Sequence, residues 1–347
     1  MTKSETVNKA QRRGTLTLKD VALVAGVTPM TVSNVLNGRD SQVGAKTRER
    51  VRAAIEQLGY RPHAAARQLR SQRTNALGML VLDDVPQFLN DPFTTQVVAG
   101  LSNVATENDY SVVLQGVRSD NMLDAPLLAQ LRTDGVCAIL SGPRDRRRAL
   151  IERLINLRVP LVLVQEAYDH ADVCTVRQDD HRGASQIAEY LVAQGARRMM
   201  FLRPAERWPA MSERIRGTQN VCDRHGASLT IVACGDESLA ATQAAVAEAI
   251  DAEGLPDAIV GGNDRMAMAA LKLLAQRGIK VPDDLRVTGF NSFDFAAYAV
   301  PSLVTVRSDA YAMGYRAGAE LLRTIETGAF STRDIVLPVS FVPGQSA

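Results

Sequence analysis

Two short helical segments joined by a single tight turn constrain how the N-terminal part of this chain can fold. Residues 17–26, TLKDVALVAG, carry apolar residues at helical spacing, and these are Leu18, Val21, Ala22 and Ala25. Gly26 suits the left-handed conformation that ends a helix, while Thr28 can cap and Pro29 can begin the next one. Because so few residues separate the two segments, the helices must meet at a sharp angle.

The second helix has an unusual outer face. Val32, Val35 and Leu36 form its inward stripe, and the other side is small, neutral and rich in amides. A third amphipathic segment, 46–59, completes a small core, which is typical of a helix-turn-helix unit whose second helix enters the DNA major groove. We expect base contacts from Thr28, Pro29, Met30, Thr31, Ser33, Asn34 and Asn37. A plain helical bundle with a solvated basic surface is the alternative.

Charge is divided unevenly along the chain. Residues 1–75 hold 14 Lys and Arg against 5 Asp and Glu, whereas the remainder holds 26 against 33. A basic N-terminal part with an acidic body behind it indicates an anionic partner for the first part alone. Lys19, Arg39, Lys46 and Arg48 are candidates for phosphate contacts.

The stretch TLKDVALVAGVTPMTVSNVLNG, followed by KTRERVRAAIEQLGYRP, resembles the LacI/GalR family of bacterial transcriptional regulators. The resemblance continues more loosely to the C-terminus. It implies a repressor that binds a pseudo-palindromic operator as a homodimer under the control of a small molecule. The family usually has Arg where this chain has Asn34, and Ser where it has Gly44. Asn pairs with adenine whereas Arg prefers guanine, so we predict an altered operator base at that position.

A basic linker, 62–75, follows the helix-turn-helix domain, 1–61 (core 16–61). Its helix-prone part is too short to be stable alone in water. The resemblance implies a hinge helix that enters the minor groove, where Leu69 stands at the position of an apolar wedge between base steps. The hinge residues are His63, Ala65, Ala66 and Leu69; the family's usual Asn is His63 here. A disordered tether is the alternative.

From Ala76 onward the pattern changes to eight continuous apolar runs alternating with amphipathic helices. Such runs predict parallel strands covered on both faces. Two series of four predict an α/β fold with two doubly wound lobes, which in the family is periplasmic-binding-protein-like. We expect an N-lobe of residues 76–176 plus 307–328 and a C-lobe of 177–306 plus 329–347.

Candidate effector-binding residues lie where strands end or helices begin, next to the expected cleft. They are Asp91, Phe93, Gln165, Trp208, Arg214, Asn263 and Asn291, most of them at positions that bind ligand in the family. Arg214 lies in SERIRG, which matches the family motif S-x-R-x-x-G. Asp91 could instead be a simple helix cap, Arg214 a surface residue and Trp208 a buried anchor. Gln165 and Asn291 replace carboxylates of relatives, which favours a sugar acid weakly over a neutral sugar.

Other functional classes find little support in the sequence. We identify no nucleotide-binding or hydrolase motif, so an enzyme is disfavoured, and we expect no cofactor. The four Cys and four His residues show no metal-binding spacing. The sequence has neither an apolar run long enough for a membrane helix nor a signal peptide, which argues against an exported solute-binding protein and favours a cytoplasmic, nucleoid-associated one.

Overall fold

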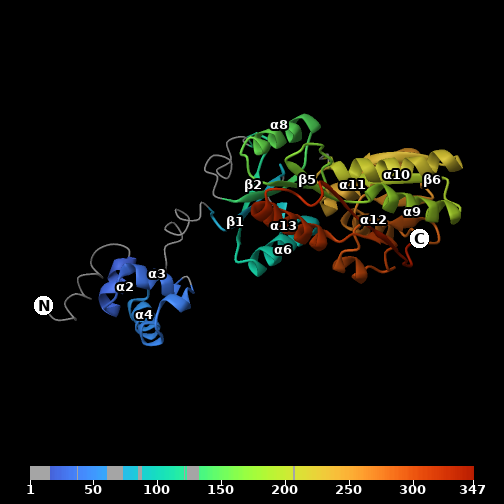
Figure 1. Cartoon of the computed structure of the whole chain (residues 1–347). Coiled ribbons are helices and arrows are strands. Elements are labelled where there is room, and N and C mark those ends of the chain that lie inside the picture. Colours follow the sequence, from blue (N-terminus) through green and yellow to red (C-terminus); the bar gives the residue numbers. More distant parts are fainter. Residues whose placement is uncertain are drawn as a thin grey trace. The chain divides into compact units, whose positions relative to one another are not determined.

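The structure is a computed structural model that describes residues 16–36, 38–60, 73–84, 88–120, 122, 133–205 and 208–347. The chain divides into two compact units, 1–74 and 75–347. Figure 1 shows the helices and strands of both units.

The first unit contains the helices expected from the sequence. They are α2 (Leu18–Ala25), α3 (Pro29–Leu36) and α4 (Ala45–Leu58), with a short 3₁₀ turn η1 (Asp40–Gln42). Gly26 and Gly59 end α2 and α4 in the left-handed conformation, and Gly44 stands at the N-cap of α4. Asp20 accepts hydrogen bonds from the backbone N–H and the hydroxyl of Thr17, which fixes the first turn of α2.

The first lobe of the second unit is a six-stranded sheet in the order β11-β5-β4-β3-β1-β2, parallel throughout. Its strands are β1 (Ala76–Leu82), β2 (Ser111–Val117), β3 (Gly135–Leu140), β4 (Leu161–Val164), β5 (Val173–Gln178) and β11 (Asp334–Leu337). Its helices are η2 (Phe88–Asn90), α6 (Pro92–Glu107), α8 (Arg144–Ile155) and α13 (Ala310–Thr327). In Figure 1, α8 covers one face of the sheet, and α6 and α13 cover the other.

The second lobe has a parallel sheet in the order β7-β6-β8-β9, extended by a short antiparallel pair. Its strands are β6 (Arg198–Arg203), β7 (Ser228–Ala233), β8 (Ala258–Gly261), β9 (Arg286–Thr288), β10 (Thr305–Arg307) and β12 (Ser340–Val342). Its helices are α9 (Asp180–Ala193), α10 (Pro209–His225), α11 (Leu239–Glu253), α12 (Asp264–Gln276) and η4 (Asp294–Tyr298). Separate apolar clusters fill the space on the two faces, so the α/β architecture with two doubly wound lobes is confirmed.

One predicted lobe boundary differs from the structure. The chain crosses between lobes after β5, which ends at Gln178, and after β10, which ends at Arg307, close to the expected positions. The third crossing was expected at 329, but β11 pairs in parallel with β5 and therefore belongs to the first sheet. The boundary lies after Leu337. The strand DIVL has only four residues, and buried and exposed positions alternate along it. Its apolar pattern therefore does not indicate which of the two sheets it joins.

Helices α6 and α13, which cover the same face of the first sheet, pack unusually closely against each other. A Cβ on Gly314 would lie 2.0 Å from the carbonyl oxygen of Val97, and one on Gly100 would lie 2.1 Å from that of Tyr311. Glycine at both positions lets the two backbones touch. The N-terminus of α6, which faces the pocket described below, is thereby held firmly to the body of the lobe.

Candidate functional site

The outward face of α3 matches the predicted DNA-contacting surface in part. Met30 is 64% exposed, Thr28 and Pro29 are exposed, and Thr31 and Asn34 are half-buried. Ser33 is the exception, because it is only 6% exposed and lies beside the core residue Val32. The prediction that Ser33 belongs to the uncovered face was therefore wrong. On a helical wheel it falls at the edge of the apolar stripe, where a third helix can cover a small side chain.

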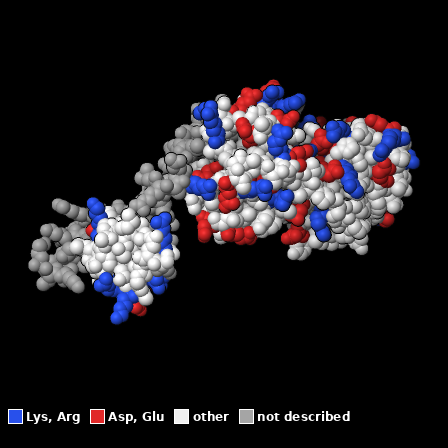
Figure 2. Space-filling view, in the orientation of Figure 1, with Lys and Arg blue, Asp and Glu red and all other residues white. Residues whose placement is uncertain are grey.

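The start of α3 is fixed by its own side chains. The backbone N–H of Thr31 donates to the hydroxyl of Thr28 at 3.2 Å, and the two hydroxyls lie 2.9 Å apart. Thr28 thus caps the helix as expected, and its side chain is exposed. On the face shown in Figure 2, Lys and Arg outnumber acidic residues around the first unit, whereas both signs are interspersed over the second. Arg48, a predicted phosphate contact, donates to the carbonyl of Val43 at 2.9 Å.

Five predicted DNA contacts lie outside the described residues. They are Asn37 and the hinge residues His63, Ala65, Ala66 and Leu69. Their roles in the major and minor grooves stay predictions.

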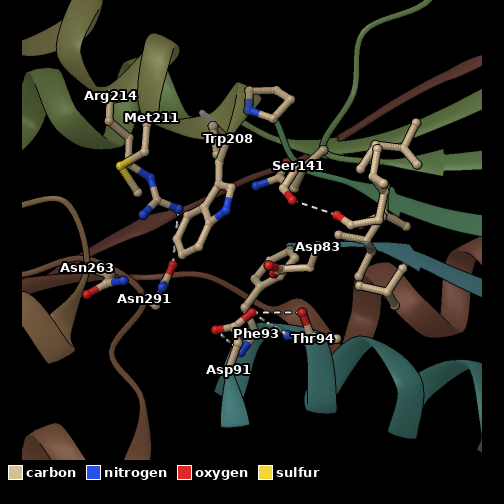
Figure 3. A pocket seen from close by; sticks show the side chains of 18 residues that line it. Asp83, Asp91, Phe93, Thr94, Ser141, Trp208, Met211, Arg214, Asn263 and Asn291 are labelled. Atoms are coloured by element: carbon tan, nitrogen blue, oxygen red, sulfur yellow. Dashed lines mark hydrogen bonds between the residues drawn. The ribbon is translucent and has the colours of Figure 1, made fainter. Parts of the chain in front are cut away.

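The seven predicted effector residues all line one cleft of the second unit. The cleft encloses about 640 Å³, including the part open to solvent, and lies where the carboxyl ends of β1, β3 and β4 face the start of α10. In Figure 3, Asp91, Phe93 and Thr94 rise from α6 on one side, while Trp208, Met211 and Arg214 come from α10 on the other. Residues more than 180 positions apart in sequence are therefore brought together by the lobe architecture, at the kind of strand edge where ligands bind in open α/β sheets.

Arg214 is held rigidly at one end of this cleft. It is 3% exposed, its Nε donates to Asp180 Oδ1 at 2.7 Å, and its Nη2 donates to Asn291 Oδ1 at 3.2 Å. Its Nη1 donates to the carbonyl of Gly262, and its Cζ lies 3.8 Å from the centre of the Phe290 ring. This fixes the plane of the guanidinium, so that its remaining N–H groups have a defined direction.

The three predicted amide residues are engaged within the protein. Gln165 donates to Asp180 at 3.0 Å and accepts from the backbone of Gln178 at 3.1 Å. Asn263 caps α12 through the N–H of Met266. Asn291 accepts from Arg214 and from Ser308 through one oxygen, which leaves its NH₂ group as the donor for other partners. Gln165 and Asn291 both have positive φ, 61° and 104°, a conformation that non-glycine residues rarely adopt and that often marks functional sites.

Asp91 and Trp208 both line the cleft and also make structural contacts, and their roles in effector binding stay predictions. Asp91 caps α6 by accepting from the N–H groups of Phe93 and Thr94, and it also lines the cleft. Trp208 packs partly against the second-lobe core, yet its indole points into the cleft toward Phe93 (Figure 3). The two aromatic rings provide flat apolar walls on opposite lobes, suited to the face of a sugar or planar ring.

Two buried acids lie behind the second-lobe wall. Burial raises the pKa of Glu237 to about 7, although its hydrogen bond from Asn263 at 2.8 Å opposes the shift. Burial likewise raises the pKa of Asp264 to about 7, against hydrogen bonds from the Thr305 hydroxyl and the Phe293 N–H. Both residues tie the loops that carry Asn263 and Asn291 to their neighbours.

Comparison with known proteins decides the family. Residues 17–63 match the family model of bacterial regulatory proteins of the lacI family, and residues 188–347 match that of the periplasmic binding protein-like domain. The HTH-type transcriptional regulator CelR of Thermobifida fusca is 32% identical over 92% of this chain and 94% of its own length. The chain belongs to the LacI family of bacterial transcriptional regulators. The HTH-type transcriptional repressor CytR of Escherichia coli K12 is 30% identical over 90% of this chain and 91% of its own length.

Solved structures of this LacI family share the fold. The lac repressor dimer bound to operator and the anti-inducer ONPF has a TM-score of 0.83 at 26% identity, covering 96% of this chain and 99% of that one. The complex of the regulator CelR with cellobiose has a TM-score of 0.70 at 26% identity, covering 96% and 100%. This LacI-family chain is therefore a DNA-binding transcriptional regulator with an effector-binding domain, and not an enzyme.

Several cleft residues of this LacI-family chain were not identified from its sequence. Asp83 and Ser141 line the cleft just after β1 and β3, and the rule that ligands bind at the carboxyl ends of strands could have found both. Asp180, which lies behind the cleft, has no sequence feature that would have indicated its role. It begins α9, and only the three-dimensional fold brings it to Arg214. Gln165 and Asn291 replace carboxylates of relatives, and Asp180 supplies a carboxylate to Arg214 from another element.

No helix in the described part of the chain is long and apolar enough to cross a membrane. The same residues hold no group of three or more His, Cys, Asp or Glu side chains placed to bind a metal ion. All four cysteines are buried and unpaired.

Proposed function

We propose that this regulator is a homodimeric repressor that acts in the cytoplasm, on operators of the nucleoid DNA. Each protomer reads one half of a pseudo-palindromic operator through α3. The observation that supports this most directly is the neutral outer face of α3, where Met30 is exposed and Asn34 is half-buried, on a unit whose visible face carries more Lys and Arg than acidic residues. A neutral surface of small side chains permits close approach to base edges, while the surrounding cations hold phosphates.

The cleft between the lobes is the proposed effector site. Aromatic walls from Phe93 and Trp208 and polar groups from Asp91, Arg214 and Asn291 suit a hydroxylated metabolite such as a sugar. The CelR relative was solved with cellobiose, which agrees with this class. A ligand that binds one lobe arrangement more tightly than another shifts the population of the two and thereby changes affinity for DNA.

Operator selection with the full chain tests the DNA part of the proposal. We expect selection from random duplex DNA to yield a two-fold symmetric consensus, and Asn34→Ala to weaken binding to it at least tenfold. Gln57→Ala, an exposed neutral residue on α4, is the matched control and should bind as the wild type does. A consensus without two-fold symmetry would contradict the dimer, and equal binding by both variants would contradict the role of α3.

A thermal-shift panel of sugars, sugar acids and nucleosides tests the effector part. A ligand that binds only the folded protein raises the melting temperature by mass action. We expect at least one hydroxylated metabolite to do so and to change operator affinity. A ligand that stabilises the body without changing operator affinity would contradict allosteric control.

A further inference from the structure

Asp180 and Arg214 form a buried ion pair immediately behind the effector cleft. Both side chains are 4% exposed, and Arg214 Nε lies 2.7 Å from Asp180 Oδ1. Arg214 lines the cleft, whereas Asp180 does not. The carboxylate therefore acts on a ligand through residues that line the cleft, Arg214 and Gln165, and not by direct contact.

The surroundings of Asp180 suit an ionised carboxylate. Besides Arg214, it accepts hydrogen bonds from Gln178 Nε2 at 2.9 Å and from Gln165 Nε2 at 3.0 Å. Among the described residues all three partners are donors, the arrangement that buried carboxylates need. The negative charge of Asp180 thus offsets the positive charge of Arg214.

The other charged side chains among the described residues that line the cleft are negative. Arg214 is the one cationic side chain among the described residues that line it, and the carboxyls of Asp83 and Asp91 lie on the opposite lobe. Asp264, behind the arginine, is fully buried. With Arg214 offset by Asp180, the described residues that line the cleft offer an anionic ligand no net attraction.

We propose that Asp180 is a specificity-determining residue: by cancelling the charge of Arg214, it makes the cleft exclude anionic ligands and select uncharged, hydroxylated ones. Arg214 then serves as a rigid hydrogen-bond donor and not as an anion-binding charge. This inference rests on the proposed effector role of the cleft. It favours a neutral sugar over the sugar acid that the sequence weakly favoured as the effector.

Trp208 allows a test that needs no effector. It is the only tryptophan of the chain, it is half-buried, and it lines the same cleft. Quenching of its fluorescence by iodide, divided by quenching by neutral acrylamide, measures the access of an anion to the cleft. Asp180→Asn should raise this ratio about twofold or more at constant low ionic strength, since an uncompensated unit charge nearby has an effect of that order. Quenching by caesium should fall relative to acrylamide.

Two variants provide matched controls. Asp179→Asn removes the same charge from the same helix terminus but touches Arg182 and not Arg214, so its ratio should stay near that of the wild type. Gln165→Glu/Asp180→Asn returns a carboxylate to the hydrogen-bonded network and should return the ratio toward the wild-type value. An unchanged ratio in folded Asp180→Asn, or an equal rise in Asp179→Asn, would overturn the proposal.

A charge-neutral variant decides the question if Asp180→Asn does not fold. Asp180→Asn/Arg214→Gln removes both charges, so the iodide ratio should equal that of the wild type within the error of the measurement. A fall of about twofold or more would mean that Arg214 is an uncompensated cation in the wild type, which overturns the inference. If no sugar or related metabolite binds, the proposed effector class fails, but these quenching ratios are unaffected and still test the role of Asp180.

Discussion

Gly314 and Val97 bring two helices of the first lobe into backbone contact. A Cβ at position 314 would lie 2.0 Å from the carbonyl oxygen of Val97, closer than any real Cβ approaches an oxygen. Val97 lies near the N-terminus of α6, where Asp91 and Phe93 line the cleft, and α13 lies between the two late crossings of the chain. This contact therefore links the geometry of the cleft to the packing of a segment more than 200 residues away.

Gly314→Ala should destabilise the second unit by about 2–3 kcal/mol, because the methyl group can fit only if the two helices move apart. Urea unfolding followed by circular dichroism measures the change. Arg316→Ala, at an exposed position of the same helix, should stay within about 0.5 kcal/mol of the wild type. Equal midpoints for wild type and Gly314→Ala would show that the helices adjust freely.

Asn34→Arg should move operator preference toward guanine at one symmetric position of the binding site. Arginine pairs with the O6 and N7 edge of guanine, and such a contact discriminates by about 1–3 kcal/mol. Selection of operators with both proteins measures the shift. Ser33→Ala, one residue earlier but buried, should lower the stability of the first unit and leave the consensus unchanged. An identical consensus for Asn34→Arg would remove Asn34 from the base-reading surface.

Arg214→Ala should abolish the response of DNA binding to the effector while DNA binding itself persists. The substitution removes the cleft's rigid donor, and the DNA-binding helices belong to a separate compact unit. Operator titrations with and without the ligand found in the thermal-shift panel provide the measurement. Arg216→Ala, an exposed residue paired with Glu213, is the control and should respond normally. A normal response in Arg214→Ala contradicts the assignment.

The stability of the second unit should fall as pH rises from about 4.5 to 7. The pKa values of Glu237 and Asp264 are raised on folding from ordinary values of 4.5 and 3.8 to about 7. The folded protein therefore binds more protons than the unfolded chain in this window, and each group lowers the free energy of unfolding by about 1.4 kcal/mol per pH unit. Above about pH 7 this contribution levels off.

Glu237→Gln isolates one of these two groups. The amide cannot ionise, so the difference in the free energy of unfolding between pH 5 and pH 7.5 should shrink relative to the wild type. Glu248→Gln, which changes an exposed residue of α11, should leave that difference unaltered. The measurement is urea unfolding at the two pH values, and equal differences in wild type and Glu237→Gln would contradict the raised pKa.

The sequence predicted features that depend on local patterns. The eight apolar runs from Ala76 onward all became strands, because a continuous apolar run between helices has few other stable places in a soluble fold. The sequence also predicted that α2 and α4 end at glycines and that α3 begins at Pro29. These positions depend on local backbone preferences, which the residues themselves reveal. The seven candidate residues share one cleft because strand ends and helix starts converge there.

Features that depend on contacts between residues far apart in the chain could not be predicted from the sequence. The partner of Arg214 is Asp180, 34 residues away, and nothing in either local pattern links them. The sheet to which β11 belongs is set by its pairing with β5 and not by its own four residues. Ser33 was misplaced because the burial of a small side chain at the edge of an apolar stripe depends on tertiary packing, which its own helix pattern does not reveal.

The return of β11 to the first sheet has a consequence for synthesis of the protein. The DNA-binding unit is translated first and needs nothing beyond residue 74 for its own core. The first lobe needs α13 and β11, which leave the ribosome only after nearly all of the chain has been made. At about 5–20 residues per second, the head emerges many seconds before the lobe can close. Each nascent chain thus acquires its DNA-binding part before its effector-binding part is complete.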